Sequence, residues 1–332
     1  MHIPDNYLSP ATCAVMGAIM IPVWRRAVKK VKKEITKEKM PLMGIGASLS
    51  FLTMMFNVPL PGGTTGHAVG GTLIAILIGP EAACISITIA LLIQALLFGD
   101  GGVLAFGANC FNMAFVLPFV GYYIYKFLKE RLKIDKGEYI SSFLGSYIAL
   151  NIAAFCAAIE FGLQPLLFKD ATGAAMYCPY PLAITIPAML IPHLLALGVL
   201  EAVITVGVLS FIKKVSPETI YENSKIKTKP IYAFIIALIC LSPLGLLAPS
   251  TAWGEWGTQD ISAVATGSKI LGFVPEGMQN GFSFTSLMRG YTVKGLPDIF
   301  AYILSAVAGV AILMIVFRLI ASVRKNSRNM NN

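Results

Sequence analysis

The feature of this sequence that most constrains its fold is a series of apolar stretches separated by short breaks rich in charge, glycine or proline. Many of the stretches reach or approach the roughly 20 residues that an α-helix needs to cross a bilayer. Charged residues make up only 13% of the chain, against about a quarter in a soluble domain. The sequence therefore predicts an all-α polytopic membrane protein.

Nine helices are expected, about seven in the first two thirds of the chain and two near its C-terminus. Ala68–Gly79 is short for a full crossing and ends at Gly79-Pro80, so it could instead form a broken or re-entrant hairpin with the segment that follows. The expected ranges are Ser9–Val28, Leu42–Val58, Ala68–Gly79, Ala82–Phe98, Asn109–Lys129, Tyr139–Leu163, Leu182–Ile212, Ile231–Leu247 and Pro297–Ala321.

Lysine and arginine are concentrated in alternate breaks between these stretches. Four breaks, at 25–39, 126–136, 213–229 and 318–328, contain 22 of the 26 basic residues. Because cytoplasmic loops retain Lys and Arg, nine crossings place the N-terminus outside and the C-terminus inside a prokaryotic cell membrane. The net charge of +9 is thus explained by orientation and by contact with anionic lipid, and no nucleic-acid binding is expected.

The N-terminal stretch "MHIPDNYLSP" has neither the positive start nor the cleavage site of a signal peptide. Met1 is therefore expected to be the mature N-terminus. The loop "VPLPGGTTGHAVGG" follows the second predicted helix and lies on the same outer side. His2 and His67 are consequently predicted to meet.

A histidine in second position can chelate a metal. The free amine of Met1, the backbone nitrogen of His2 and its Nδ1 would bind through fused five- and six-membered rings, and His67 would supply a fourth nitrogen. An all-nitrogen tetragonal site favours Ni(II) or Cu(II) over Zn(II), which prefers tetrahedral ligands. Co(II) stays possible with a looser coordination sphere.

Burying a polar residue at membrane depth costs free energy, so such residues are functional candidates. Asp100 and Asn109 lie at an outer helix entrance and could orient His2 or His67, although an interhelical hydrogen bond explains an asparagine equally well. Glu201 and Thr205 lie in the middle of a helix. We expect Glu201 to be too deep to reach the outer site, and to serve packing or coupling. The third histidine of the chain, His193, is interpreted as a helix-packing residue.

Several other site classes find no support in the sequence. The six cysteines are scattered without a CxxC pair, which argues against a disulfide framework or a thiolate metal site. Patterns for a phosphate-binding loop, for HExxH and for GxSxG are all lacking. A secondary transporter remains an alternative, with Glu201 and Asp100 relaying ions. A membrane metalloenzyme would need an open coordination position and a nearby general base, and a closed four-nitrogen site provides neither.

Four motifs in order, "MHIPDNYLSP", "GGTTGHAVGG", "LLFGDGG" with "GANCFNM", and "EAVIT", resemble the CbiM/NikM family over about residues 1–213. That family comprises the substrate-binding S components of energy-coupling factor (ECF) importers for nickel and cobalt. The resemblance implies metal ligands at Met1, His2 and His67. One departure is Asn6, where the family often has glycine.

The resemblance also implies a division of labour. S components bind metal as substrate and hydrolyse nothing, so the partners expected are a membrane T component and a pair of cytoplasmic ATPases. Residues 214–229 would be a cytoplasmic basic linker. Residues 230–332, with "VPEGM" and "LPDIF" in an outer loop between two helices, resemble the small N component of these importers, fused here to the S component.

Overall fold

The computed structural model describes residues 1–35, 40–61, 63–217, 228–248, 250–266 and 269–329. Most of the predicted linker at 214–229 lies outside these residues. Within them, seven helices are long and apolar enough to cross a membrane, in agreement with the predicted helical membrane protein. They span Pro10–Glu34, Pro80–Phe98, Phe106–Arg131, Gly137–Leu167, Leu182–Val215, Lys229–Leu247 and Asp298–Ser322.

Several of these spans combine an α-helix with a π-helical or 3-10 segment. The elements of the first half are α1 (Pro10–Glu34), α2 (Met40–Met55), β1 (Val58–Leu60), β2 (Thr64–Gly66), α3 (Gly71–Ile78), α4 (Pro80–Ile93), η1 (Gln94–Phe98), α5 (Phe106–Asn109), η2 (Cys110–Val116) and α6 (Leu117–Arg131).

The second half runs from α7 to α12. Its elements are α7 (Gly137–Leu167), α8 (Leu182–Pro192), η3 (His193–Leu197), α9 (Gly198–Val215), α10 (Lys229–Leu241), η5 (Ser242–Leu247), η6 (Ile261–Ala263), β3 (Ala265–Thr266), β4 (Lys269–Ile270), α11 (Glu276–Gln279), η7 (Arg289–Tyr291) and α12 (Asp298–Asn329).

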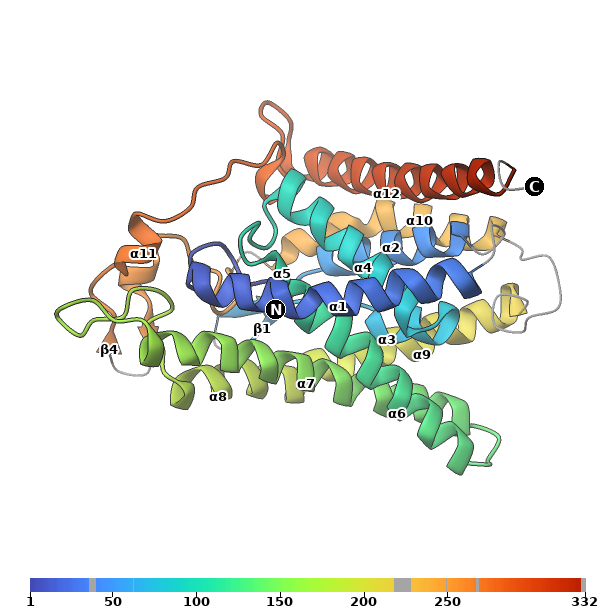
Figure 1. Ribbon diagram of the computed structural model, residues 1–332, viewed down its shortest axis with the longest axis horizontal. Coiled ribbons are helices and arrows are strands. Elements are labelled where there is room, and N and C mark those ends of the chain that lie inside the picture. Colours follow the sequence, from blue (N-terminus) through green and yellow to red (C-terminus); the bar gives the residue numbers. More distant parts are fainter. Residues whose placement is uncertain (36–39, 62, 218–227, 249, 267–268, 330–332) are drawn as a thin grey trace.

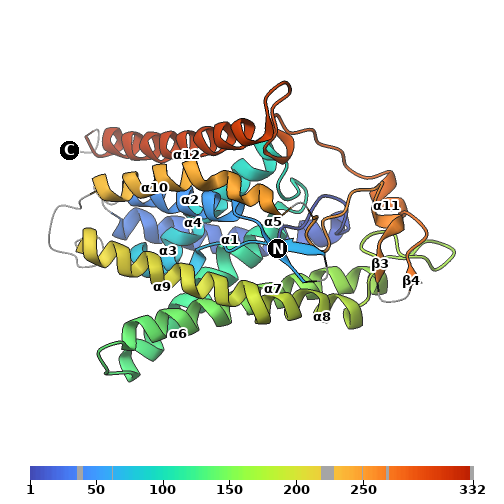
Figure 2. The ribbon, with the colours of Figure 1, turned by 180° about the vertical axis from the view of Figure 1, so that it is seen from behind.

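The helices run roughly parallel to the long axis of the molecule (Figure 1). The C-terminus and the turn between α6 and α7 lie at one end of this axis, and α11 and β4 lie at the other. Seen from behind, α12 and α10 cover α2 and α4 on one side of the bundle (Figure 2). The contact between α12 and α2 is close because Gly309 faces Phe51, where an added Cβ would lie 2.3 Å from the ring.

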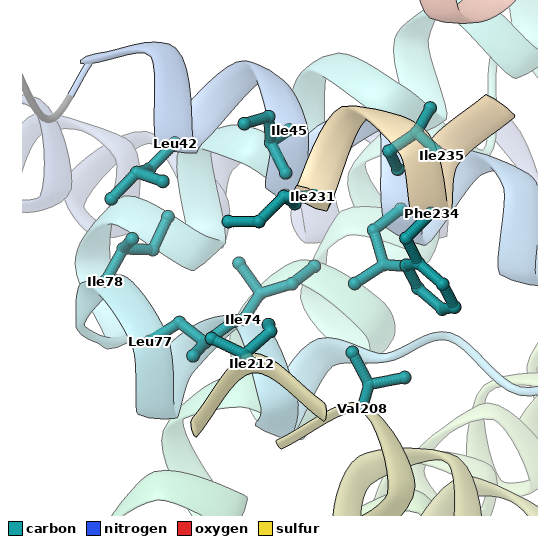
Figure 3. A pocket seen from close by; sticks show the side chains of 12 residues that line it. Leu42, Ile45, Ile74, Leu77, Ile78, Val208, Ile212, Ile231, Phe234 and Ile235 are labelled. Atoms are coloured by element: carbon teal, nitrogen blue, oxygen red, sulfur yellow. The ribbon is translucent and has the colours of Figure 1, made fainter. Parts of the chain in front are cut away.

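Apolar side chains join the C-terminal part of the chain to the first part. Ile231, Phe234 and Ile235 of α10 face α2, α3 and α9 around a cavity of only about 20 Å³ (Figure 3). The lining is almost entirely aliphatic, which is typical of tight helix packing in a membrane. The helix α10 therefore packs as part of the bundle.

The predicted helix at Ala68–Gly79 is shorter in the structure. It begins at Gly71, and the preceding residues 67–70 are buried without helical structure. Backbone of this kind is tolerated at membrane depth where protein surrounds it. Gly79, with a φ of 88°, separates α3 from α4 and meets the demand for a positive φ that glycine satisfies best. Residues 67–78 therefore form a non-helical stretch followed by a short helix.

The N-terminus enters the bundle instead of lying on its surface. Both views mark it near the middle of the molecule (Figures 1 and 2). Met1, His2 and Ile3 are 7%, 2% and 0% exposed. The chain then turns outward and starts α1, whose first turn is capped by the Ser9 side chain accepting a hydrogen bond from the amide of Thr12.

Candidate metal centre

The inserted N-terminal segment, residues 1–5, is held by hydrogen bonds to its main chain. The Ile3 amide donates to Oδ1 of Asn109 at 2.7 Å, and Nδ2 of Asn109 donates back to the Ile3 carbonyl at 3.0 Å. The amide of Gly102 also donates to the Ile3 carbonyl, at 2.8 Å. Asn109, for which the sequence suggested orienting His2 or His67 or making an interhelical hydrogen bond, bonds the backbone next to His2.

Asp5 fastens the same segment from its other end. Its carboxylate accepts hydrogen bonds from the amides of Val103 and Leu104, at 3.1 and 2.7 Å. Sequence reasoning did not single out Asp5, although an acid after a proline in so apolar a chain is an available signal. Asn6 follows with a φ of 69°, a conformation that asparagine tolerates better than most residues. This explains how asparagine fits where the related family often has glycine.

The rings of His2 and His67 face each other in the buried interior. Nδ1 of His2 lies 3.2 Å from Nε2 of His67, and the two side chains are 2% and 7% exposed. Two nitrogen ligands at right angles around one metal, each at about 2.0 Å, would be about 2.8 Å apart. The observed separation is therefore close to that of neighbouring ligands of a single ion.

The hydrogen bonding of His67 determines which of its nitrogens is available. Its Nδ1 lies 3.0 Å from the carbonyl oxygen of Ala68, which can only accept, so this nitrogen carries the proton. Nε2 then presents its lone pair toward His2. The backbone nitrogen of His2 makes no hydrogen bond to any described residue. Nε2 of His67, which faces Nδ1 of His2, can therefore act as a ligand, and the backbone nitrogen of His2 can do so once it loses its proton.

Burial keeps both imidazoles neutral. It lowers the pKa of His2 to about 3, an effect to which the nearby terminal ammonium adds and which a polar contact with Gln94 opposes. Burial likewise lowers the pKa of His67 well below its ordinary value, again with the ammonium adding to the effect. At neutral pH the two rings therefore carry lone pairs, as metal ligation requires.

Asp100 contacts His2, as the sequence suggested. Its Oδ1 lies 3.1 Å from Nδ1 of His2, and because the imidazole is neutral this is a hydrogen bond and not an ion pair. Oδ2 of Asp100 accepts hydrogen bonds from Nε2 of Gln94 at 3.1 Å and from the Tyr291 hydroxyl. Gln94 is completely buried, and its Oε1, like Nε2 of His2, has no hydrogen-bond partner among the described residues.

Glu201, expected to be too deep to reach the outer site and to serve packing or coupling, contacts the backbone that follows His67 and not a proposed ligand. Its Oε2 accepts hydrogen bonds from the amides of Val69 and Gly70, at 2.7 and 3.0 Å. The loop that carries His67 descends into the bundle to meet it, which a loop at the membrane surface could not do. Thr205, one turn further along α9, is buried, and its hydroxyl has no partner among the described residues. Thr205 is therefore not one of the residues that hydrogen-bond with Glu201 and the amides of Val69 and Gly70.

Glu255 and Tyr291, from the last third of the chain, also lie near the N-terminus and His2. The sequence analysis missed both residues. Glu255 lies 3.8 Å from the terminal amine of Met1, and Tyr291 bonds to Asp100 and Gln94. Burial raises the pKa of Glu255 to about 7, with the terminal ammonium opposing this shift. No local sequence signal could have identified them, because about 250 residues separate Met1 from Glu255.

A polar cavity connects this centre with the outer end of the molecule. Its volume is about 490 Å³, and its walls include the N-terminal segment, the loop after η1 and the C-terminal segment. The acidic side chains on its lining are Asp5, Asp100 and Glu255. The cavity reaches His2, and Arg289 is the basic residue on its lining.

The chain matches two known protein families and a solved structure of a transporter. Residues 2–219 match the family model described as the cobalt uptake substrate-specific transmembrane region, CbiM, and residues 227–326 match the PDGLE domain. A crystal structure described as a truncated transition metal transporter is 56% identical, with a TM-score of 0.61, and covers 64% of this chain and 99% of its own.

Two relatives extend over nearly the whole chain. A probable fused nickel transport protein, LarMN, from Lactiplantibacillus plantarum is 52% identical over 96% of this chain and 97% of its own length. A fused nickel transport protein, NikMN, from Rhodobacter capsulatus is 41% identical over 99% of both chains. The order of the two matched regions is therefore shared with proteins of the same length.

Proposed function

Because the chain belongs to the CbiM family, we propose that it is the substrate-specific component of an ECF importer and captures Ni(II), or Co(II), at the outer face of the membrane. Membership makes it a nickel/cobalt uptake transport component and a multi-pass membrane protein of a prokaryotic transport family. The nature of the binding site, the preferred metal and the partners are the proposal.

One observation carries the proposed site: two neutral, buried imidazoles face each other at 3.2 Å beside an inserted chain terminus. The metal would take the Met1 amine, the backbone nitrogen and Nδ1 of His2, and Nε2 of His67. These four nitrogens form a plane in which His67 is the neighbour of Nδ1. Such a site suits Ni(II), for which a tetragonal nitrogen environment is favourable.

Nearby residues would hold this arrangement. When Nδ1 of His2 binds metal, the ring proton moves to Nε2, and Oε1 of Gln94 is the buried acceptor available to it. Gln94 is in turn fixed by Asp100 and Tyr291. Ligating histidines generally donate their second nitrogen in this way, which orients the ring. Glu201 would fix the backbone that follows His67, which is a positioning role.

Nickel is the preferred substrate of the proposal. Two of the relatives that match nearly the full length of this chain are described as a probable fused nickel transport protein and a fused nickel transport protein. A relative described as a cobalt transport protein, from Lachnoclostridium phytofermentans, is 30% identical over 63% of this chain. The proposed partners are a membrane T component and a pair of cytoplasmic ATPases, which would supply the energy of transport.

The test is metal selection by detergent-purified protein with a native N-terminus and a C-terminal tag. The protein is exposed to equal nickel, cobalt, copper and zinc, and its metal content and absorption spectrum are measured. One equivalent of nickel with a square-planar spectrum, lost in His2→Ala, is expected. Zinc retained equally by wild type and His2→Ala would refute the site and favour an ion-coupled secondary transporter.

Two variants test the chelate itself. One additional residue between Met1 and His2 enlarges the chelate ring and should abolish tight binding without unfolding the protein. His67→Ala removes one donor and should change the spectrum. Unaltered affinity in the insertion variant, or an unaltered spectrum in His67→Ala, would mean that the ligands are elsewhere.

A further inference from the structure

The third histidine of the chain, expected from sequence to be a helix-packing residue, lines a cavity together with Met1. His193 begins the π-helical segment η3 and is 5% exposed. Together with Met1, Gly66 and Trp253 it lines a cavity of about 20 Å³. A cavity of this size has room for one water molecule. His193 and Met1 therefore line the same small cavity.

The hydrogen bond made by His193 leaves its other nitrogen available. Nδ1 lies 2.6 Å from the carbonyl oxygen of Met189, so Nδ1 carries the proton and Nε2 presents a lone pair. This Nε2 is buried and has no hydrogen-bond partner among the described residues. A buried acceptor without a partner is costly, and in native structures it generally has a functional explanation.

The local fold directs this residue toward the centre. Only His193 and Leu197 of η3 are buried, while Leu194 and Leu195 are 42% and 77% exposed. Leu197 packs against Gly66, where an added Cβ would lie 2.4 Å from Cδ1 of Leu197. Since Gly66 directly precedes His67, the buried face of η3 is pressed against the strand that delivers a proposed ligand. Short π-helical segments are frequent at functional sites.

From this geometry we propose that His193 is a positioning residue for the N-terminal amine. Its Nε2 accepts a hydrogen bond from the Met1 amine, through the one water that the cavity can hold, and thereby directs the amine lone pair toward the metal. Glu255 contacts the same amine at 3.8 Å. The amine is thus held by two side chains from distant parts of the chain.

This inference rests on the proposed nickel function, and the experiment separates the two. Ni(II) affinity is measured by chelator competition on the full chain with a native N-terminus. His193→Phe, which keeps the ring but removes the acceptor, should bind Ni(II) about 10- to 100-fold more weakly with an unchanged absorption spectrum. His193→Gln places an oxygen near the position of Nε2 and should restore binding to within about 3-fold of wild type.

Thr185→Val is the matched control, because it removes a buried hydrogen bond of α8 to Ala158 without touching the cavity. It should bind Ni(II) as wild type does. Wild-type affinity in His193→Phe would overturn the inference, as would an altered spectrum, which would make His193 a metal ligand. A loss in His193→Phe matched by Thr185→Val would reduce the effect to packing. Absence of nickel binding by wild type would instead refute the proposed function.

Discussion

The Tyr291 hydroxyl donates a hydrogen bond to Oδ2 of Asp100, 191 residues earlier in the chain, while Oδ1 of Asp100 lies 3.1 Å from Nδ1 of His2. A residue of the C-terminal segment is therefore two contacts away from a proposed metal ligand. Tyr291 also packs against the ring of Phe98, with ring centroids 5.0 Å apart. The segment that matches the PDGLE domain is thus joined to the proposed centre by specific polar and aromatic contacts.

Tyr291→Phe should weaken Ni(II) binding about 10-fold without changing the absorption spectrum. The change removes the hydrogen bond donated to the Asp100 carboxylate, worth about 1.5–3 kcal/mol, and the hydrogen bond accepted from Gln94. It leaves the four proposed ligands in place. Chelator competition measures the affinity. Tyr302→Phe is the control, since it removes a comparable buried hydrogen bond, to the Met55 carbonyl, and should bind normally. Equal effects of both variants would contradict a specific role for Tyr291.

Gly102→Ala should abolish tight metal binding while the helices remain folded. A Cβ at this position would lie 2.5 Å from the backbone nitrogen of Asp5, and backbone cannot move aside as a flexible side chain can. The N-terminal segment would be displaced from its hydrogen bonds to Asn109 and Gly102. Metal content and circular dichroism are the measurements. Gly207→Ala, in α9 with open space around it, should leave both unchanged.

Glu201→Leu should lower both thermal stability and nickel affinity. It leaves the amides of Val69 and Gly70 buried without their acceptor, at about 1–3 kcal/mol for each group. Glu201→Gln keeps an oxygen acceptor at the same position and should fall between Glu201→Leu and wild type. A thermal unfolding series reads out stability. The proposed role would be rejected if Glu201→Leu melted at the wild-type temperature and bound nickel normally.

Nickel binding near pH 7 should release no protons from the imidazoles. The folded pKa of His2 is about 3 and that of His67 is well below 6.5, so both rings are already neutral. The released protons then come from the His2 amide and the terminal amine, and affinity should weaken as pH falls because protons compete for these nitrogens. Nickel titration in a pH-stat counts them. Release of more than two protons per nickel would show that the rings are charged before metal binds.

The same shifts determine how acid acts on the metal-free protein. A histidine whose pKa falls on folding binds fewer protons in the folded state, so stability is complete above the unfolded pKa of about 6.5. For His2 it declines as pH falls from there toward about 3. The melting temperature should therefore drop over this window, and drop less in His2→Ala. Equal slopes for both proteins would argue that His2 is not buried in the neutral form.

Much of the secondary structure could be predicted because it depends on local composition. All nine apolar stretches correspond to helical segments, and most limits differ by a few residues at caps and basic ends. The exception is the helix predicted at Ala68–Gly79. In the structure this helix begins at Gly71, because the backbone before it is buried without helical structure. The meeting of His2 and His67 also followed from topology, since two outer segments share one side. That they bind metal remains a prediction.

Other features depended on how distant segments pack. From sequence, Glu201 was judged by its depth along a straight helix, which says nothing about a loop that descends to meet it. His193 looked like a packing residue because its neighbours in sequence are apolar, and only the tertiary structure shows that it lines a cavity together with Met1. Glu255 and Tyr291 had no local signal at all.

The sequence by itself determined the membrane-spanning class, the alternation of basic breaks and the presence of a second-position histidine, because each is a property of short stretches of chain. Only the tertiary structure decided which side chains surround the N-terminus. Burial and hydrogen-bond partners there come from segments as much as 276 residues apart, and their proximity is a consequence of helix packing and loop path that no local pattern encodes.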